Sequence, residues 1–232
     1  MEPPPNKVLE EILATGRMTD RDGQSRPIYS NISAGHVAAL YRAILQQRPK
    51  QAIEIGMCCG ISTLAMLTAL QQLGEGGRLI SIDPWQMSHE KGMGMWNVRR
   101  AGLDSLHELI EKPSHAALPE LLGKGCRIDF AYIDGNHLFD YALLDFFYLD
   151  KMLNVGGVIG FNDCGWLSIH HVLNYVRTHR KYHELETGLP KQYEGRNFLV
   201  SLARRVQGRS NSDRYFQKLE DWEPDGNFYR HI

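Results

Sequence analysis

Short apolar runs alternate with longer amphipathic segments through the middle of the chain. The apolar runs are bounded by glycine and polar residues, which predicts buried strands. The segments between them place apolar residues three and four positions apart, which predicts helices. The predicted strands are 51–55, 78–82, 107–111, 128–133 and 156–161, and the predicted helices are 61–73, 95–106, 115–122, 138–152 and 167–179. Such alternation is typical of an α/β fold whose doubly wound, parallel sheet is covered by helices on both faces.

The N-terminal part does not follow this alternation. A short helix is expected at 6–14, followed by a polar, glycine-containing loop or lid at 15–33. Ser33 has a side chain suited to a helix N-cap, which predicts a helix that begins there and continues through Gln47.

The C-terminal part is expected to complete the sheet. Segments 182–186 and 197–202 face each other across Gly188, Pro190 and Gly195, which predicts a strand and an antiparallel return. The residues that follow are too aromatic for a solvated linker, so we expect them to dock on the domain or on a second copy of the chain, which makes a homodimer a candidate. The predicted units are an N-terminal helix and lid (1–33), a main domain (34–205) and a docking tail (206–232).

The turn after the first of these strands carries the strongest chemical signal. Gly56 and Gly60 bound this turn and allow the backbone to approach a ligand closely. Asp83 ends the next predicted strand, 27 residues after Gly56. In nucleotide-binding α/β folds an acid at this place accepts hydrogen bonds from the ribose hydroxyls. The spacing therefore predicts a cofactor that contains a nucleoside.

Residues in and before this turn narrow the choice of cofactor. Cys58 stands where a dinucleotide fingerprint has its second glycine, which argues against an NAD(P)-dependent oxidoreductase, the alternative enzyme class. No lysine lies near the turn, so it is not a P-loop. Glu54 would repel a pyrophosphate but tolerate a cationic sulfonium and ammonium group. The pattern favours S-adenosylmethionine.

A second motif lies in the later strands. Its residues are Asp134-Gly135-Asn136-His137, Asp145, Gly156-Gly157 and Asn162-Asp163. Together with the glycine turn, they resemble class I S-adenosylmethionine-dependent methyltransferases, in particular the small-molecule O-methyltransferase group of macrocin, cephalosporin-pathway and catechol-type enzymes. The resemblance covers roughly 34–205. It implies a Rossmann-like, mostly parallel seven-stranded sheet with an antiparallel last strand, and methyl transfer to a small molecule, at a hydroxyl oxygen.

The resemblance also implies roles for individual residues. The cofactor-binding set would be Glu54, Gly56, Gly60, Ser62, Asp83, Trp85, Ser114 and Asp134. Trp85 would cover the adenine, since a flat ring stacks well on a purine. The substrate side would be formed by His137, Asp163 and Trp166. His137 is the expected general base, because an imidazole can accept a proton at neutral pH, and Asp134 is the second catalytic candidate.

A divalent metal ion is not favoured. Its ligands would be Asp134, Asp163 and Asn162, but Asn136 and Asn162 stand where metal-dependent relatives present acids. Each asparagine keeps an oxygen but lacks the negative charge that a hard cation prefers. We therefore expect methyl transfer without a magnesium-type ion. The same two asparagines keep a non-catalytic S-adenosylmethionine-binding partner as the alternative function.

Composition argues against several other classes. The chain has 232 residues and a formal net charge of −1, and it lacks the basic clusters that predict nucleic-acid binding. No apolar run approaches the length of a membrane span, and no signal peptide is visible. The four cysteines have no zinc-ligand spacing. These observations favour a cytoplasmic enzyme that acts on a small molecule, with neither nucleic acid nor a membrane as partner.

Overall fold

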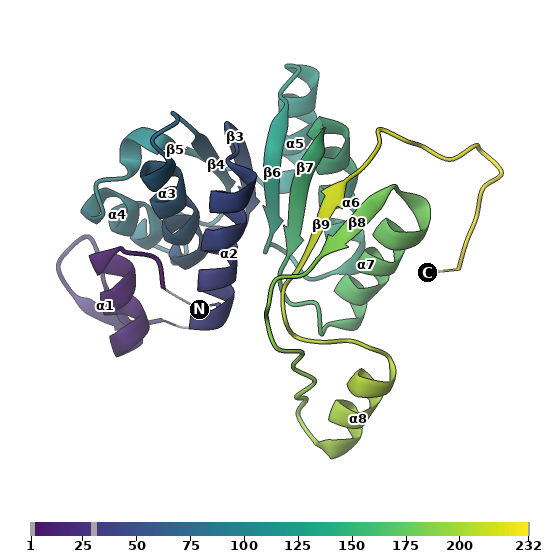
Figure 1. The fold of residues 1–232 in the computed structure, drawn as a ribbon. Helices are drawn as coiled ribbons and strands as arrows, with labels where there is room; N and C mark the ends of the chain where they lie inside the picture. Colours follow the sequence, from purple (N-terminus) through teal and green to yellow (C-terminus); the bar gives the residue numbers. More distant parts are fainter. Residues whose placement is uncertain (1–2, 29–31, 232) are drawn as a thin grey trace.

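The computed structural model describes residues 3–28 and 32–231 and has an α/β architecture built on a seven-stranded sheet (Figure 1). The sheet strands are β3 (Gln51–Ile55), β4 (Arg78–Ile82), β5 (His107–Ile110), β6 (Ile128–Ile133), β7 (Leu153–Phe161), β8 (Tyr182–Leu185) and β9 (Arg214–Lys218). Their order is β5-β4-β3-β6-β7-β9-β8. β9 is antiparallel to β7 and β8, and the other pairs are parallel. The predicted sheet, mostly parallel with an antiparallel last strand, is confirmed.

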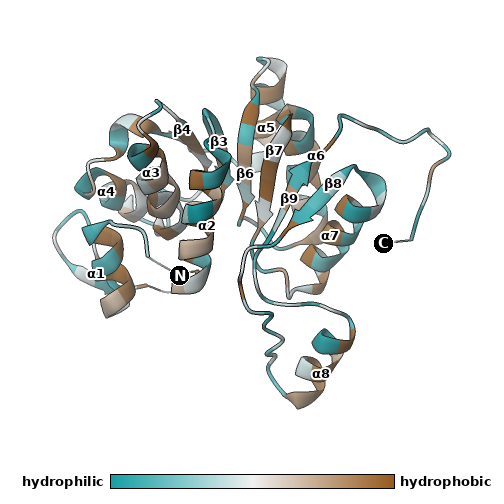
Figure 2. Cartoon of the chain, in the orientation of Figure 1, coloured by the Kyte–Doolittle hydropathy of each residue, from teal (hydrophilic) through white to brown (hydrophobic). Residues whose placement is uncertain are grey.

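Helices cover both faces of the sheet. On one face lie α2 (Ala34–Gln47) and α3 (Ile61–Leu73), and α1 (Lys7–Thr15) and α4 (Met93–Arg100) pack against α3. The other face packs against α5 (Ser114–Gly123), α6 (Phe139–Met152) and α7 (Leu167–His179). Successive residues of a strand alternate between faces, so Phe130 packs on the α2 side and Ala131 on the α6 side. Figure 2 shows the hydrophobic residues of the buried strand β7. Within 3–28 and 32–231, no helix has the length and apolarity to cross a membrane.

The helix predicted at 95–106 is wrong at both ends. α4 begins at Met93 and ends at Arg100, and a separate 3₁₀ turn spans Asp104–Leu106. Gly102 lies between them with φ of 68°, a left-handed conformation that glycine adopts without strain and that stops the helix. The helix start predicted at Ser33 is confirmed, because Ser33 Oγ accepts a hydrogen bond from the His36 N–H (3.3 Å).

The segment 15–33, expected to be a loop or lid, contains a small hairpin. β1 (Arg17–Thr19) and β2 (Ser25–Pro27) pair in antiparallel register. Asp20 closes the turn between them, because its Oδ1 accepts hydrogen bonds from the N–H groups of Asp22 (3.0 Å) and Gln24 (2.8 Å). The rest of this prediction includes 29–31, which lie outside the described residues.

The strand predicted at 197–202 is wrong, because this segment begins the helix α8 (Phe198–Val206). Asn197 caps the helix by accepting a hydrogen bond from the Val200 N–H (2.9 Å). The antiparallel strand is instead β9, within the segment expected to be a docking tail, and it inserts between β7 and β8. Its residues Tyr215 and Phe216 are buried on opposite faces of the sheet.

Candidate active site

The loops that follow β3, β4, β6 and β7 meet at one cavity of about 1050 Å³. The chain crosses from β3 to β4 and β5 on one side and to β6 and β7 on the other, so the strand order reverses between β3 and β6. Ligands of open α/β sheets bind at such a point, at the carboxyl ends of the strands. Each of the four loops lines the cavity, with Gly56, Asp83, Asp134, His137 and Asn162 among the lining residues. The ends of these four strands therefore converge on one site.

Glu54 lies in β3 behind the glycine turn and does not line the cavity. Its carboxylate is fully buried and accepts hydrogen bonds from Ser62 Oγ (2.5 Å), Thr63 Oγ1 (2.7 Å) and Ser81 Oγ (2.7 Å). Burial raises the pKa of Glu54 to about 7. Glu54 therefore ties β3 to β4 and to the first turn of α3. Among the other predicted cofactor residues, Ser62 borders the cavity and Gly60 does not.

Gly56 allows two loops of the site to touch. Its φ is 87°, and a Cβ atom there would lie 2.2 Å from the carbonyl oxygen of Asp134. The Asp134 N–H in turn donates to the carbonyl oxygen of Ile55 (2.9 Å). Only glycine permits both this conformation and this approach, so the turn after β3 lies directly against the loop after β6.

Asp83 joins the turn after β3 to the loop after β4. Its Oδ2 accepts hydrogen bonds from the N–H groups of Met57 (3.0 Å) and Cys58 (2.8 Å), and its Oδ1 accepts one from the Trp85 N–H (2.8 Å). The carboxylate is nearly buried but lines the cavity, and its oxygens have remaining lone pairs. Its assignment to a ribose stays a prediction.

Trp85 and Ser114 lie on the same cavity as Asp83. Trp85 follows β4 and is largely exposed, with its ring edge-on to His89 at a centroid distance of 4.9 Å. Ser114 is the first residue of α5, which follows β5. The structure thus brings together Trp85, which is expected to cover the adenine, and Ser114, another member of the predicted cofactor-binding set.

The predicted substrate residues also lie together. His137 Nε2 is 2.7 Å from Asp163 Oδ2, and both side chains are partly exposed. The Trp166 ring stacks on the His137 ring with centroids 5.5 Å apart and planes 15° from parallel. Ser168 Oγ donates to the backbone carbonyl of His137 (2.5 Å), which joins the loop after β6 to α7. Asp163 has φ of 51°, a left-handed conformation that aspartate adopts more readily than most residues other than glycine.

Carboxyl groups are concentrated at this end of the cavity. Burial raises the pKa of Asp134 well above its ordinary value, and the nearby charges of Asp213, Asp163 and Glu54 act in the same direction. Such crowding of carboxylates favours a cationic ligand, because positive charge would relieve their mutual repulsion.

The donor set fits a hard divalent ion. Asp134, His137 and Asp163 can each offer one ligand atom, and these atoms lie within 4.8 Å of one another. Two carboxylate oxygens and an imidazole nitrogen are acceptable ligands for such an ion. Asn162, the third ligand proposed from the sequence, lines the cavity, and its Nδ2 donates to the Tyr132 hydroxyl (3.1 Å). The expectation that methyl transfer needs no metal stays a prediction.

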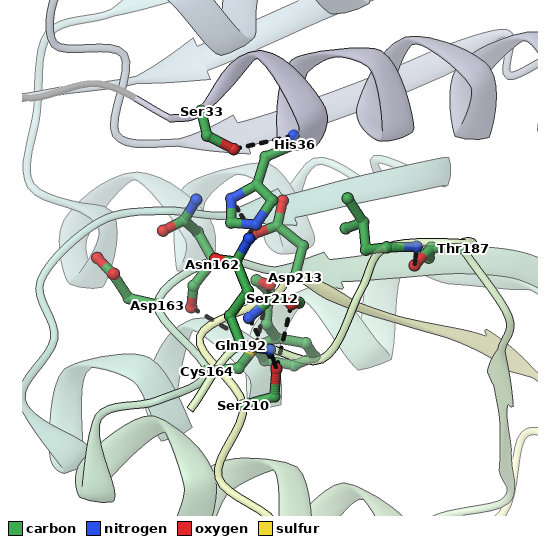
Figure 3. A network of polar contacts seen from close by, with 12 residues as sticks. Ser33, His36, Asn162, Asp163, Cys164, Thr187, Gln192, Ser210, Ser212 and Asp213 are labelled. Atoms are coloured by element: carbon green, nitrogen blue, oxygen red, sulfur yellow. Dashed lines mark hydrogen bonds and ion pairs between the residues drawn. The ribbon is translucent and has the colours of Figure 1, made fainter. Parts of the chain in front are cut away.

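The sequence analysis did not identify His36, Arg204 and Asn211, which line the cavity, or Asp213, which lies beside His36. Arg204 of α8 donates through Nη1 to Asn211 Oδ1 (2.8 Å), so this helix is anchored at the cavity. Figure 3 shows His36 and Asp213 beside Asn162 and Asp163. His36 belongs to the helix before the first sheet strand and Asp213 precedes the last one, so no local motif contains either residue.

Comparison with known proteins agrees with this geometry. Residues 53–164 match a family described as "Methyltransferase domain". A protein of Arabidopsis thaliana named in the caffeoyl-CoA O-methyltransferase class is 30% identical over 139 residues, which are 58% of this chain and 54% of that protein. The flavonoid 3',5'-methyltransferase of Vitis vinifera is 29% identical over 123 residues (50% and 48%). Caffeoyl-CoA O-methyltransferase 1 of Eucalyptus globulus is 27% identical over 167 residues (71% and 61%).

Solved structures share the fold at low sequence identity. The O-methyltransferase from Bacillus cereus, in complex with S-adenosylhomocysteine, has a TM-score of 0.69 at 15% identity, covering 94% of this chain and 92% of that one. The O-methyltransferase TomG from Streptomyces achromogenes, in complex with S-adenosylmethionine, has a TM-score of 0.68 at 15% identity, covering 93% and 91%.

The sheet order is that of class I methyltransferases, the cavity lies where the strand order reverses, and residues 53–164 match a methyltransferase domain, as the resemblance implies. The curated relatives described above are named as caffeoyl-CoA O-methyltransferases and as a flavonoid 3',5'-methyltransferase. The chain spans 48% to 61% of the length of the three curated relatives described above.

Proposed function

We propose that the protein transfers the methyl group of S-adenosylmethionine to a hydroxyl oxygen of a small molecule. One observation carries the proposal: the glycine turn and Asp83, which suit a nucleoside cofactor, share a single cavity with the His137–Asp163 pair. The named relatives are methyltransferases of caffeoyl-CoA and flavonoids, so a hydroxylated aromatic compound is the expected class of acceptor.

The charge distribution supports a cationic cofactor. Asp134 lies against the glycine turn, and its pKa is raised well above the ordinary range by burial and by neighbouring negative charge. A carboxyl group in such surroundings gains most from a positively charged partner. The ammonium and sulfonium groups of S-adenosylmethionine supply that charge, so we assign Asp134 to the methionine end of the cofactor and Asp83 to its ribose.

The transfer itself depends mostly on positioning. The acceptor oxygen forms a bond to the methyl carbon while the carbon–sulfur bond breaks, and the electron pair of that bond stays on sulfur, which leaves S-adenosylhomocysteine. Holding the oxygen in line with the sulfonium makes the displacement effectively unimolecular. The proton of the acceptor hydroxyl goes to His137, and Asp163, 2.7 Å away, stabilises the imidazolium that forms. A divalent ion, where bound, would be held by the carboxylates of Asp134 and Asp163 and would favour the ionised form of the acceptor hydroxyl.

Two measurements test this proposal. Calorimetry should show that S-adenosylhomocysteine binds and that NAD(H) does not, since the turn lacks the second glycine of a dinucleotide site. Mass spectrometry should then show methylated product when the protein is incubated with S-adenosylmethionine and a panel of hydroxylated aromatics that includes caffeoyl-CoA. Cofactor binding without transfer to any acceptor would instead support the non-catalytic alternative, and binding of NAD(H) alone would contradict the assignment of the cofactor.

A further inference from the structure

A second imidazole–carboxylate pair lies at the cavity, built from distant parts of the chain. His36 is in the first turn of α2, and Asp213 immediately precedes β9. His36 Nδ1 is 3.4 Å from Asp213 Oδ1, and the exposed fractions of the two side chains are 12% and 0%. Figure 3 shows the His36 ring directed from α2 toward Asp213. The transfer step derived above uses neither residue.

Asp213 is held from behind by two tyrosines. Its Oδ2 accepts hydrogen bonds from the hydroxyls of Tyr132 (2.8 Å) and Tyr215 (3.4 Å). Among residues 3–28 and 32–231, its Oδ1 has no other hydrogen-bond partner, and the His36 Nδ1 atom at 3.4 Å is the group placed to donate to it. A carboxylate fixed in this way holds the imidazole proton on the nitrogen that faces it, here Nδ1. Burial lowers the pKa of His36 below its ordinary value, which favours the neutral imidazole, and the nearby charge of Asp163 only partly opposes this shift.

The other ring nitrogen of His36, Nε2, makes no hydrogen bond in the described part of the chain. This nitrogen is buried, and His36 lines the cavity. With the proton on Nδ1, Nε2 carries a lone pair and can only accept a hydrogen bond. A buried acceptor without a donor is unfavourable, so a ligand that brings a donor to this place is favoured.

We propose that His36, oriented by Asp213, binds the acceptor substrate by accepting a hydrogen bond at Nε2 from one of its hydroxyl groups. Because His137 takes the proton of the reacting hydroxyl, the hydroxyl at His36 is a different one, and the acceptor carries at least two. Asp213 acts through His36 and is a positioning residue. This inference rests on the proposed function, since it places the acceptor between His137 and His36.

The proton position can be measured without any methyl transfer. Long-range proton–nitrogen NMR of histidine-labelled protein at pH 8 should show His36 protonated on Nδ1 and bare on Nε2, with the signals assigned by their loss in His36→Gln. In Asp213→Asn the amide can donate to Nδ1, which should move the proton to Nε2. A proton on Nε2 in the unaltered protein would overturn the inference, whether or not an acceptor is known.

Kinetics with caffeoyl-CoA as the acceptor probe test the contact itself. His36→Ala should lower kcat/KM for the acceptor about tenfold, mainly through KM, because one hydrogen bond to a buried acceptor is lost. His36→Gln should recover part of this loss, since its Oε1 can accept. The dissociation constant of S-adenosylhomocysteine should stay within about twofold, because the contact is to the acceptor. His183→Ala is the matched control, since His183 is exposed on β8 and does not line the cavity.

A double-mutant cycle separates orientation from a merely structural role. In the unaltered background, Asp213→Asn should lower kcat/KM for the acceptor about as much as His36→Ala does. In the His36→Ala background the same substitution should lower kcat/KM by less than about twofold, because the imidazole that Asp213 orients is gone. The inference would be contradicted if the fold-losses in kcat/KM of the two single variants simply multiplied in the double variant. Equal losses in the affinity for S-adenosylhomocysteine would also contradict it. If the unaltered protein methylates no acceptor, the proposed function fails, and the NMR result still decides the place of the proton.

Discussion

Replacing Asp83 by alanine tests the cofactor site most sharply. The carboxylate accepts three backbone hydrogen bonds, from Met57, Cys58 and Trp85. In the proposed complex it also accepts two hydrogen bonds from the ribose hydroxyls. A hydrogen bond to a charged group contributes roughly 1.5–3 kcal/mol, so loss of the two ribose contacts alone corresponds to about 3 kcal/mol, or about a hundredfold in affinity. Because water can replace part of this, we expect S-adenosylhomocysteine to bind at least about tenfold more weakly.

The chain offers a matched control for loop anchoring. Asp129 accepts hydrogen bonds from the N–H groups of Lys50 (2.9 Å) and Gln51 (3.3 Å) and from Asn154 Nδ2 (2.8 Å), but it lies at the start of the sheet strands and does not line the cavity. Asp129→Ala should therefore lower the melting temperature and leave calorimetric affinity for S-adenosylhomocysteine unchanged. If Asp83→Ala also lowers stability without weakening cofactor binding, the ribose assignment is refuted and Asp83 only holds the loops together.

The remaining predictions concern the chemical step. His137→Gln should lower kcat about 100-fold with unchanged cofactor affinity, since an amide can hold geometry but cannot take the proton; near-normal turnover in a stopped assay would remove His137 as the base. Removal of divalent ions with a chelator should leave methyl transfer largely intact, and a full loss restored by magnesium would assign Asp134 and Asp163 to a metal instead. Burial raises the pKa of Asp213 to about 7. As the pH falls through that value, Asp213 takes up a proton and can donate to Nδ1 of His36, so kcat/KM for the acceptor should fall on the acid side; a pH profile of His36→Gln should lack that part of the loss, and identical profiles would contradict the coupling.

The middle of the fold was predictable because its signals are local. Each parallel strand is a short apolar run between turn residues, and each helix between them carries its own apolar face, so periodicity defines both. The strand at 197–202 was wrong because its apolar run also fits a short amphipathic helix, capped by Asn197 and ending in Arg204 and Arg205, which suit a helix C-terminus. Pairing of β9 between β7 and β8 depends on tertiary contacts that no local pattern contains.

The site, too, has residues that local signals predict and residues that depend on tertiary contacts. Residues such as Asp134 and Asp163 were predictable because topology places every parallel strand end at one edge of the sheet. Glu54 has the expected place in the chain, but alternation of side chains along β3 directs it to three hydroxyl groups in the core rather than to the cavity. The pair formed by His36 and Asp213 could not be predicted, because the two residues are distant in the sequence and only the folded structure brings them together.

The most direct test of the account is transfer of an isotopically labelled methyl group. The protein is incubated with a metabolite extract and S-adenosylmethionine whose methyl group carries deuterium, and the products are compared by mass spectrometry with those of the His137→Gln variant. The account predicts a hydroxylated small molecule that gains one deuterated methyl group on oxygen, together with S-adenosylhomocysteine, and a greatly reduced yield in the variant. Absence of any labelled product, although the cofactor binds, would contradict the central claim that this cavity catalyses methyl transfer.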